Sequence, residues 1–242
     1  MILAIDAGNT RIKWGLHDGQ TWLAHGQCTH REMGAFAGAL DQLPAPQQIV
    51  LSNVAGAQIQ ATLEHALARY PITVQRVLAR ASQCGVRNGY AAPQQLGADR
   101  WAALIGAHQL GVDPALVVNA GTAVTVDALY QGAFLGGIIL PGYRMMGEML
   151  QQGTAALATP PGKFSAWPDN TADALQSGRM LAISGAVMRL RAQLRNHAGT
   201  TPELIISGGD ATTLATHLPQ PQRVVENLIL EGLRCIARED CL

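Results

Sequence analysis

The sequence has little charge, and neither sign is in excess. Of its 242 residues, 17 are Lys or Arg and 17 are Asp or Glu, so the formal net charge is zero. Proteins that bind DNA or RNA carry a basic face or stripe, so this balance argues against a nucleic-acid partner. Hydrophobic residues make up 48% of the chain and charged residues only 14%. This composition supports a sizeable core and argues against disorder.

Other common signals are missing as well. The sequence contains neither the G-x-x-x-x-G-K-[ST] phosphate loop nor the G-x-G-x-x-G dinucleotide fingerprint. No charged segment precedes the short N-terminal apolar run, which is therefore no signal peptide. No uncharged apolar stretch approaches transmembrane length. The cysteines show no C-x-x-C spacing, which suits a reducing compartment and gives no metal-site pattern. We therefore expect a soluble cytoplasmic protein that does not bind a membrane.

The stretch from Ile2 to Trp14 has the pattern of two strands joined by a polar turn. Asp6 ends a short apolar run, and Gly8 lets the backbone turn sharply because it has no Cβ atom. Asn9-Thr10 and Lys13 follow. Mg²⁺ needs hard oxygen ligands, and phosphates need N–H donors and a cation, so the stretch fits a Mg²⁺-nucleotide. The alternatives are that Asp6 only holds the turn and that Lys13 is an ordinary solvated strand charge.

A second stretch, Ala115 to Asp127, repeats this plan of strand, polar residue, Ala-Gly, polar residue and strand. The two Ala-Gly pairs lie 113 positions apart (120 − 7), and so do Gly19 and Gly132 (132 − 19). Two landmarks in one register indicate a duplicated β-β-β unit, although two matches also arise by chance.

The rest of the chain alternates strands and helices, which predicts an α/β fold with two similar halves and a ligand between them. We expect the halves to be 1–112 and 113–242, with the last helix packing back on the first half. The predicted helices are 31–43, 57–69, 98–109, 145–157, 171–197 and 224–238. The predicted shorter strands are 48–51, 71–78 and 204–207, and the predicted loops are 85–95 and 159–169.

Five motifs occur in one order along the chain: D-x-G-N-T-x-x-K, G-A-D-R, N-A-G-T-A-x-T-x-D, G-G-x-I-x-P-G and S-G-G-D. In this order, over nearly the whole chain, they resemble the type III pantothenate kinases. The resemblance implies the duplicated ribonuclease-H-like fold of actin, hexokinase and the heat-shock ATPases, with the active site in the cleft between the halves.

The resemblance also implies an activity: ATP-dependent phosphorylation of pantothenate to 4'-phosphopantothenate, the first step of coenzyme A biosynthesis. One alternative is another small-molecule kinase or ATPase of the same superfamily, although the short chain and the G-A-D-R motif favour pantothenate. Another is a nucleotide-binding accessory protein that has lost turnover. The presence of both Asp6 and Asp99 argues against that reading.

The resemblance makes Asp99 the general base. The low pKa of an aspartate is no obstacle to this role, because phosphoryl transfer depends mainly on positioning and charge neutralisation. Without the resemblance, Asp99 reads as a helix cap. The resemblance gives Tyr90 and Arg100 contacts with the substrate; the alternatives are a loop aromatic on the core and a surface ion pair. The full set of predicted substrate residues is Tyr90, Gly97, Ala98, Asp99, Arg100 and Thr171. Thr171 also reads as the N-cap of the long helix.

The implied ATP site draws on the remaining motifs. Asp6 faces Mg²⁺, and Gly208 and Gly209 let adenosine approach the backbone. Asp127 reads as a structural residue. The predicted ATP-binding residues are Asp6, Ala7, Gly8, Asn9, Thr10, Arg11, Ile12, Lys13, Thr122, Gly208 and Gly209.

Position 119 departs from the family. The family commonly has Asp there, which helps to bind a monovalent cation, K⁺ or NH₄⁺, and this chain has Asn119. We expect weaker cation dependence for this reason. The family is dimeric, so we also expect a homodimer in which helix 171–197 takes part, with Gly178 and Gly185 allowing close approach.

Overall fold

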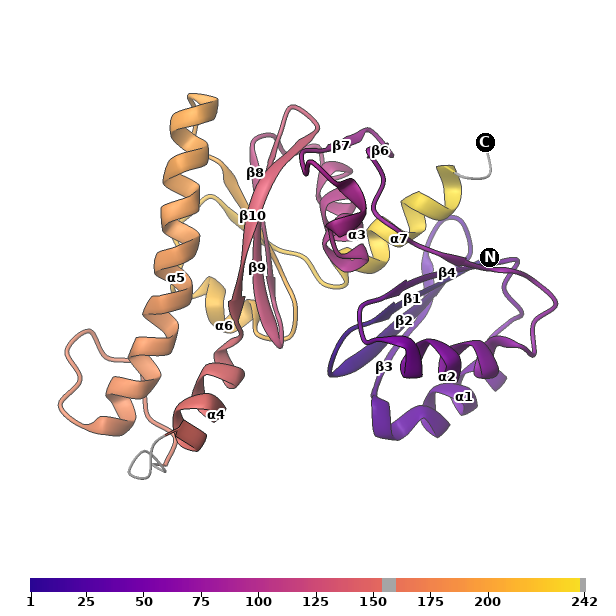
Figure 1. The fold of residues 1–242 in the computed structure, drawn as a ribbon, viewed down its shortest axis with the longest axis horizontal. Coiled ribbons are helices and arrows are strands. Elements are labelled where there is room, and N and C mark those ends of the chain that lie inside the picture. The colour runs from indigo at the N-terminus through magenta and orange to yellow at the C-terminus, as the bar shows by residue number, and fades with distance from the viewer. Residues whose placement is uncertain (154–159, 240–242) are drawn as a thin grey trace. The chain divides into compact units, whose positions relative to one another are not determined.

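A computed structural model describes residues 1–153 and 160–239 (Figure 1). Contacts divide the chain into two compact units. Unit 1 consists of residues 1–111, residues 132–134 and the chain from Asn227 onward. Unit 2 consists of residues 112–131 and 135–226.

Unit 1 is built on a five-stranded sheet in the order β3-β2-β1-β4-β5. The central strand β1 pairs antiparallel with β2 and parallel with β4. Every residue of β1 is buried, because the strand is covered on both faces, and this explains its continuous apolar run. The strands are β1 (Ile2–Ala7), β2 (Arg11–His17), β3 (Trp22–Thr29), β4 (Gln48–Asn53) and β5 (Val74–Arg76).

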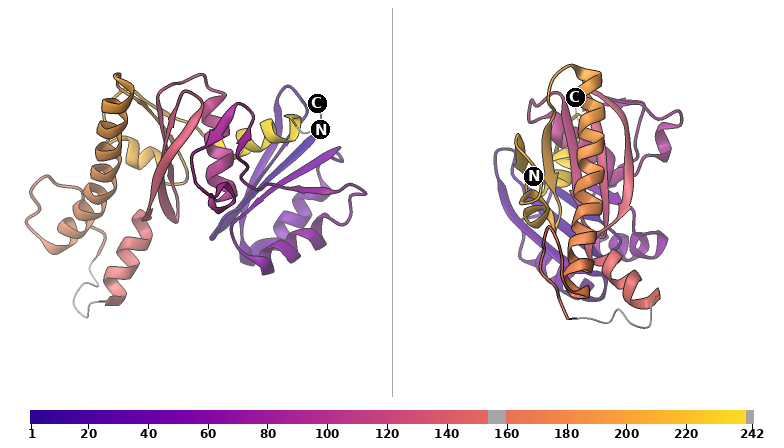
Figure 2. Two further views of the ribbon diagram at one scale, coloured as in Figure 1. Left: turned by 45° about the horizontal axis from the view of Figure 1, so that its top comes forward. Right: turned by 90° about the vertical axis from the view of Figure 1, so that its left-hand side faces the viewer.

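Two helices, α1 (Met33–Asp41) and α2 (Ala57–Leu67), cover one face of this sheet (Figures 1 and 2). Phe36 and Leu40 of α1 and Leu63 of α2 pack there against buried strand residues. A 3-10 helix, His30–Glu32, leads into α1. The apolar spacing of both helices predicted this face correctly.

The helices α3 (Ala98–His108) and α7 (Leu228–Glu239) cross each other within unit 1. A Cβ atom on Gly232 would lie 1.7 Å from the carbonyl oxygen of Ala102, and one on Gly106 would lie 2.5 Å from that of Leu228. The two backbones therefore touch, which only glycine permits. This contact fixes α3, the helix that carries the G-A-D-R motif at its start.

Unit 2 repeats the same sheet order, with β10-β9-β8-β11-β12 in place of β3-β2-β1-β4-β5. Strand β8 pairs antiparallel with β9 and parallel with β11, as β1 does with β2 and β4. The predicted duplication of the β-β-β unit is thus confirmed by strand order and direction. The strands are β8 (Ala115–Ala120), β9 (Ala123–Tyr130), β10 (Ala133–Pro141), β11 (Glu203–Ser207) and β12 (Gln222–Val224).

The helices of unit 2 are α4 (Tyr143–Gly153), α5 (Thr171–Ala198) and α6 (Ala211–Ala215). The long helix α5 packs on β8 and β9 through Met180, Ile183 and Val187 (Figure 2). Its buried Arg191 donates hydrogen bonds of 3.0–3.1 Å to the carbonyl oxygens of Pro202, Pro219 and Pro221. One guanidinium thereby fastens the chain before β11 and before β12 to α5.

Three predicted boundaries were wrong. The predicted loop 85–95 contains β7 (Val86–Asn88), which forms a hairpin with β6 (Ser82–Gln83), and the 3-10 helix Pro93–Gln95. Strand β7 pairs with Ala133 and Phe134 at the start of β10, a partner that is distant in sequence.

The predicted strand 71–78 shrinks to β5 (Val74–Arg76). The predicted helix 224–238 begins only at Leu228, since β12 and the left-handed residue Asn227 (φ 54°) precede it. Of the predicted helix 145–157, residues 154–157 lie outside the described part. Along residues 1–153 and 160–239, no helix combines the length and apolarity needed to cross a bilayer.

Candidate functional site

The first polar turn connects β1 to β2 in unit 1. The N–H of Gly8 donates to the carbonyl oxygen of Arg11 at 3.0 Å, which closes the turn and leaves Asn9 and Thr10 exposed at its tip. A ring nitrogen of His30 bonds the carbonyl oxygen of Gly8 at 2.9 Å and fixes the turn from behind. The tip thus presents small polar residues, as phosphate binding requires.

Asp6 stands one residue before the end of β1, in a row of three polar residues. Its antiparallel partner is Lys13 of β2, and its parallel partner is Ser52 of β4. Directly paired residues of a sheet point to the same face, so an ammonium, a carboxylate and a hydroxyl lie side by side. The predicted strand ended at residue 51, so sequence analysis missed Ser52 as a neighbour of Asp6.

The electrostatics of Asp6 are unusual. Burial, and in second place the negative charge of Asp99, raise the pKa of Asp6 from 3.8 to about 7, although Ser52 and Lys13 act in the opposite direction. Its Oδ1 atom is buried and has no hydrogen-bond partner among the described residues. An unpaired buried carboxylate oxygen is costly, so the Asp6 carboxylate as a whole suits a cation on one oxygen and a hydrogen-bond donor on the other.

Mg²⁺ fits this position. The ion is commonly bound by one or two carboxylates, with phosphate oxygens and water completing its coordination. In the described parts of the chain no group of three or more His, Cys, Asp or Glu side chains gathers as a metal cage. Asp6 is therefore suited to a metal that arrives with a nucleotide.

Asp99 is the second residue of α3. Its Oδ1 atom accepts a 2.8 Å hydrogen bond from the N–H of Arg100. Gly97 is the N-cap, and Asp99 lies in the first turn of the helix. A Cβ atom on Gly97 would lie 2.6 Å from Asp99 Oδ1, so the glycine of G-A-D-R makes room for the carboxylate. Desolvation by burial raises the pKa of Asp99, while the hydrogen bond from Arg100 and its charge act in the opposite direction.

Tyr90 and Arg100 form a cluster with Phe134 in unit 1. Arg100 Nη1 donates to the Tyr90 hydroxyl at 3.1 Å, and its guanidinium lies 5.8 Å from the Tyr90 ring centre and 5.7 Å from that of Phe134. Arg100 is only 5% exposed, so the alternative of a surface ion pair was wrong. A buried guanidinium between aromatic rings and beside Asp99 can recognise a polar small molecule.

Unit 2 carries the second and third polar turns. Asn119 of β8 has Thr125 of β9 as its antiparallel partner and Ser207 of β11 as its parallel partner. These three residues occupy the same strand positions as Lys13, Asp6 and Ser52 in unit 1, but none of the three is charged. Thr125 Oγ1 is buried and unpaired within the part of the chain that the structure describes.

The glycines of these turns allow close backbone approach. Gly208 has φ +104°, and a Cβ atom there would lie 2.3 Å from the carbonyl oxygen of Ala120. A Cβ atom on Gly142 would lie 2.1 Å from the carbonyl oxygen of Gly121. The predicted ATP residues Thr122, Gly208 and Gly209 therefore belong to turns that touch neighbouring backbone, with Thr122 and Gly209 exposed.

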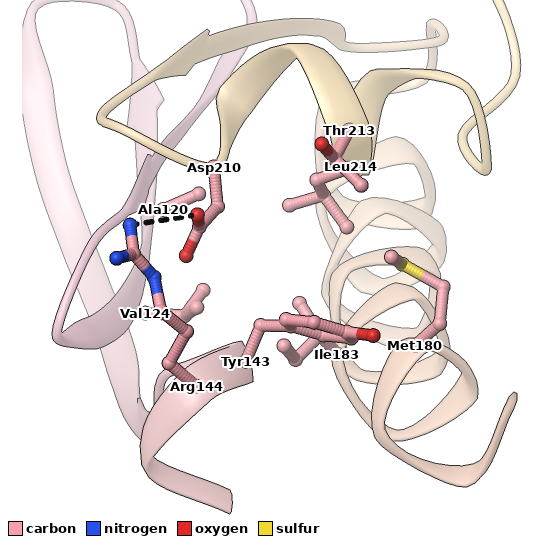
Figure 3. A pocket seen from close by; sticks show the side chains of 9 residues that line it. All are labelled: Ala120, Val124, Tyr143, Arg144, Met180, Ile183, Asp210, Thr213 and Leu214. Atoms are coloured by element: carbon pink, nitrogen blue, oxygen red, sulfur yellow. Dashed lines mark hydrogen bonds and ion pairs between the residues drawn. The ribbon is translucent and has the colours of Figure 1, made fainter. Parts of the chain in front are cut away.

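A cavity of about 260 Å³ opens beside these turns within unit 2 (Figure 3). Its wall is apolar on the α5 and α6 sides, and Arg144 contacts Asp210 at 3.4 Å across another side. The Tyr143 ring lies between these sides, and its hydroxyl is buried without a partner among the described residues. Sequence analysis did not identify Tyr143 and Arg144, although they follow P-G directly. The lining residues are Ala120, Val124, Tyr143, Arg144, Met180, Ile183, Asp210, Thr213 and Leu214.

The structure thus places the predicted residues in two groups. The phosphate turn, Lys13, Tyr90 and the G-A-D-R motif belong to unit 1, while Asn119, Thr122 and the S-G-G-D turn belong to unit 2. Thr171 also lies in unit 2 and is exposed at the first position of α5. The N-cap is Asn170, whose side chain accepts the N–H of Asp173 at 2.9 Å, so the alternative role of Thr171 as a cap was wrong. Asp127 is fully buried in β9.

The sequence matches the family model described as type III pantothenate kinase over residues 2–193. Two similar proteins carry the same name. That of Nitrosospira multiformis is 46% identical over 99% of this chain and 92% of its own, and that of Aromatoleum aromaticum is 47% identical over 99% of both. This chain belongs to the type III pantothenate kinase family.

Solved structures share the fold of this family member. A Campylobacter jejuni protein described as a Baf family transcriptional activator has a TM-score of 0.63 at 22% identity, covering 99% of this chain and 98% of that one. A Sinorhizobium meliloti protein described as a 2-dehydro-3-deoxygalactonokinase has a TM-score of 0.58 at 16% identity, covering 98% of both chains. At these identities the likeness concerns the fold, and it supports the duplicated fold expected from the motifs.

Asp99→Asn tests the base assigned by the family resemblance. We expect turnover to fall by roughly 10²–10⁴, the usual worth of a positioned base. The same change should stabilise the ligand-free protein at neutral pH. Because the Asp99 pKa is raised in the fold, the folded wild type keeps a proton that the unfolded chain releases, so its stability falls as pH rises from the ordinary Asp pKa through the raised one.

Thermal melts of both proteins between pH 4 and 8 measure this effect. The decline should be smaller in the Asn variant, in which the raised pKa of Asp6 still contributes. Gly97→Ala is the matched variant, because it keeps the carboxylate and displaces it. It should lower kcat while the protein stays folded. Turnover close to that of the wild type in both folded variants would refute the role of Asp99.

Proposed function

We propose that this protein transfers the γ-phosphoryl group of ATP to the primary hydroxyl of pantothenate and forms 4'-phosphopantothenate, the first step of coenzyme A biosynthesis. Family membership supports the substrate pair. The observation that carries the chemistry is the pair of carboxylates Asp6 and Asp99, which lie near enough for Asp99 to raise the pKa of Asp6. One carboxylate suits the metal of the nucleotide and the other the acceptor hydroxyl.

In the reaction the pantothenate hydroxyl oxygen forms a bond to the γ-phosphorus, and the bond from that phosphorus to the β,γ-bridging oxygen breaks, so ADP leaves. Asp99 accepts or orients the hydroxyl proton. Asp6 holds Mg²⁺, which neutralises charge on the phosphates when bound. Lys13 and the N–H groups of the Gly8 turn add positive potential beside the same phosphates.

The turns of unit 2 serve the remainder of ATP in this proposal. Thr122 faces the phosphates, and Gly208 and Gly209 admit the adenosine. The apolar cavity beside Tyr143 suits a flat nucleoside base, since ligand pockets are mostly apolar with a few polar groups. On the acceptor side, the buried Arg100 and Tyr90 hold the polar groups of pantothenate, with Thr171 as a further contact.

The decisive experiment is coupled ADP release with pantothenate, compared with a panel of sugars and short acids. Release that requires pantothenate supports the proposal. Release with another acceptor only would indicate a different kinase of the same fold. ATP binding without release for any acceptor would indicate an accessory protein. Either of the last two results overturns the proposal.

We also propose that a monovalent cation, K⁺ or NH₄⁺, acts weakly at Asn119. The neighbouring oxygens of Thr125 and Ser207 are neutral, so this row offers the ion no full negative charge. Stripping water from a cation is costly, and a contact charge pair at an effective dielectric constant of 20 is worth about 4 kcal/mol. The missing charge therefore weakens binding.

Asn119→Asp should strengthen activation by K⁺ or NH₄⁺, because it supplies that charge in the same position. The measurement is a K⁺ titration of turnover in a Tris-chloride background for the wild type and the variant, with Asn119→Ser as the neutral control. Superimposable steep activation curves for all three proteins would contradict the proposal.

A homodimer through α5 completes the proposed assembly. The exposed side of this helix carries Leu181, 54% exposed, and Met188, 39% exposed. A Cβ atom added to Gly178 or Gly185 would meet no atom of the described chain within 4 Å, apart from the backbone of the helix itself. These two positions therefore leave room for the close approach of a second copy. An apolar strip of this kind on a helix suits a two-fold interface.

Leu181→Glu should convert the dimer to a monomer in sedimentation velocity, because the two carboxylates would be buried at the interface. Turnover should fall too, because Thr171 lies on the same helix and would serve the site of the other copy. Ala61→Glu on the exposed side of α2 is the matched control and should change neither property. A Leu181→Glu protein that still sediments as a dimer would contradict the assignment.

A further inference from the structure

Ser52 has a hydroxyl group with no evident structural purpose. The residue is 0% exposed, one residue before the end of β4, and its Oγ atom has no hydrogen-bond partner among the residues that the structure describes. A buried polar group without a partner loses its hydration and gains nothing in return. An alanine would fit the same space without that cost, so the hydroxyl calls for a function.

The neighbour of Ser52, Asp6, has a buried acceptor atom that lacks a hydrogen-bond donor. Asp6 is its direct partner in the parallel pairing of β1 and β4, so the two side chains leave the sheet on the same face. The Oδ1 atom of Asp6 is also buried and unpaired within residues 1–153 and 160–239. A donor without an acceptor thus stands beside an acceptor without a donor.

The two halves of the fold show how specific this arrangement is. In unit 2, Ser207 of β11 pairs with Asn119 of β8 as Ser52 of β4 pairs with Asp6 of β1. A serine therefore occupies the equivalent strand position in both halves. Only in unit 1 does it stand beside a carboxylate.

A carboxylate that binds a cation through one oxygen needs a donor on the other to keep its orientation. Partners of this kind commonly decide metal affinity and activity. Lys13 flanks Asp6 on the neighbouring strand β2. Ser52 can donate from the side of β4, where no charged residue is paired with Asp6.

We propose that Ser52 is a positioning residue for Asp6: its hydroxyl donates to Oδ1 and orients the carboxylate for the metal of the bound nucleotide. This inference rests on the proposed function, since it names a residue that supports the same site. Ser52 acts through Asp6 and does not itself touch the substrate.

The test compares Ser52→Ala, Ser52→Cys and Ser52→Thr in the full-length protein. Binding of Mn²⁺ together with ADP, measured by the EPR signal of free Mn²⁺, reports the metal site without turnover. The Ala and Cys variants lack a strong donor, and we expect their Mn²⁺ affinity to fall about tenfold. The Thr variant keeps the hydroxyl and should bind Mn²⁺ as the wild type does. Melting temperatures of the Ala and Cys variants should stay close to that of the wild type, because Ser52 Oγ has no well-formed hydrogen bond to lose and only favours the ionised form of the nearby Asp6.

A second comparison separates positioning from packing. In an Asp6→Asn background, Ser52→Ala should cause no further loss of Mn²⁺ affinity, because its effect passes through the carboxylate. An equal tenfold loss in both backgrounds would overturn the inference. So would lower melting temperatures of the Ala and Cys variants with unchanged Mn²⁺ affinity. Turnover with pantothenate, measured separately, tests the proposed function, so the two proposals can fail independently.

Discussion

The structure depends on a carboxylate held at the end of a fully buried strand. Every residue of β1 is buried, and Asp6 is 7% exposed, so its charge costs free energy in the metal-free protein. Burial and the nearby Asp99 raise its pKa to about 7, against Lys13 and Ser52. In the proposed function this cost is offset by a cation, which would take the place of the missing water. This constraint explains why an α/β core carries an acid at this position.

The duplicated architecture shows what the rest of the fold contributes. The same sheet order occurs twice, and the central strand of each half ends in a row of three polar residues. In unit 1 the row contains Asp6 and Lys13, whereas in unit 2 the corresponding row is neutral. One fold thus provides two equivalent polar rows, a charged one in unit 1 and a neutral one in unit 2.

The acceptor side is fixed by backbone contact. Helix α3 begins with Gly97, whose missing side chain leaves room for the Asp99 carboxylate. Further along, α3 touches α7 at Gly106 and Gly232, so the C-terminal helix holds it in place. Arg100, one residue beyond Asp99, is fixed between Tyr90 and Phe134. Asp99 and Arg100, the residues proposed for catalysis and recognition, therefore lie on a helix that close backbone contact holds in place, as precise positioning requires.

The sequence by itself determined the elements and the family. Apolar periodicity located the long helices, and the spacing of 113 residues revealed the duplication, because both can be read along the chain without knowing which residues touch. The motifs likewise named Asp6, Asp99 and Arg100. Only the tertiary structure decided which residues are neighbours: Ser52 beside Asp6, β7 beside β10, and Gly232 against Ala102. These contacts join segments far apart in the chain, and their geometry follows from strand pairing and helix packing, which no local pattern encodes.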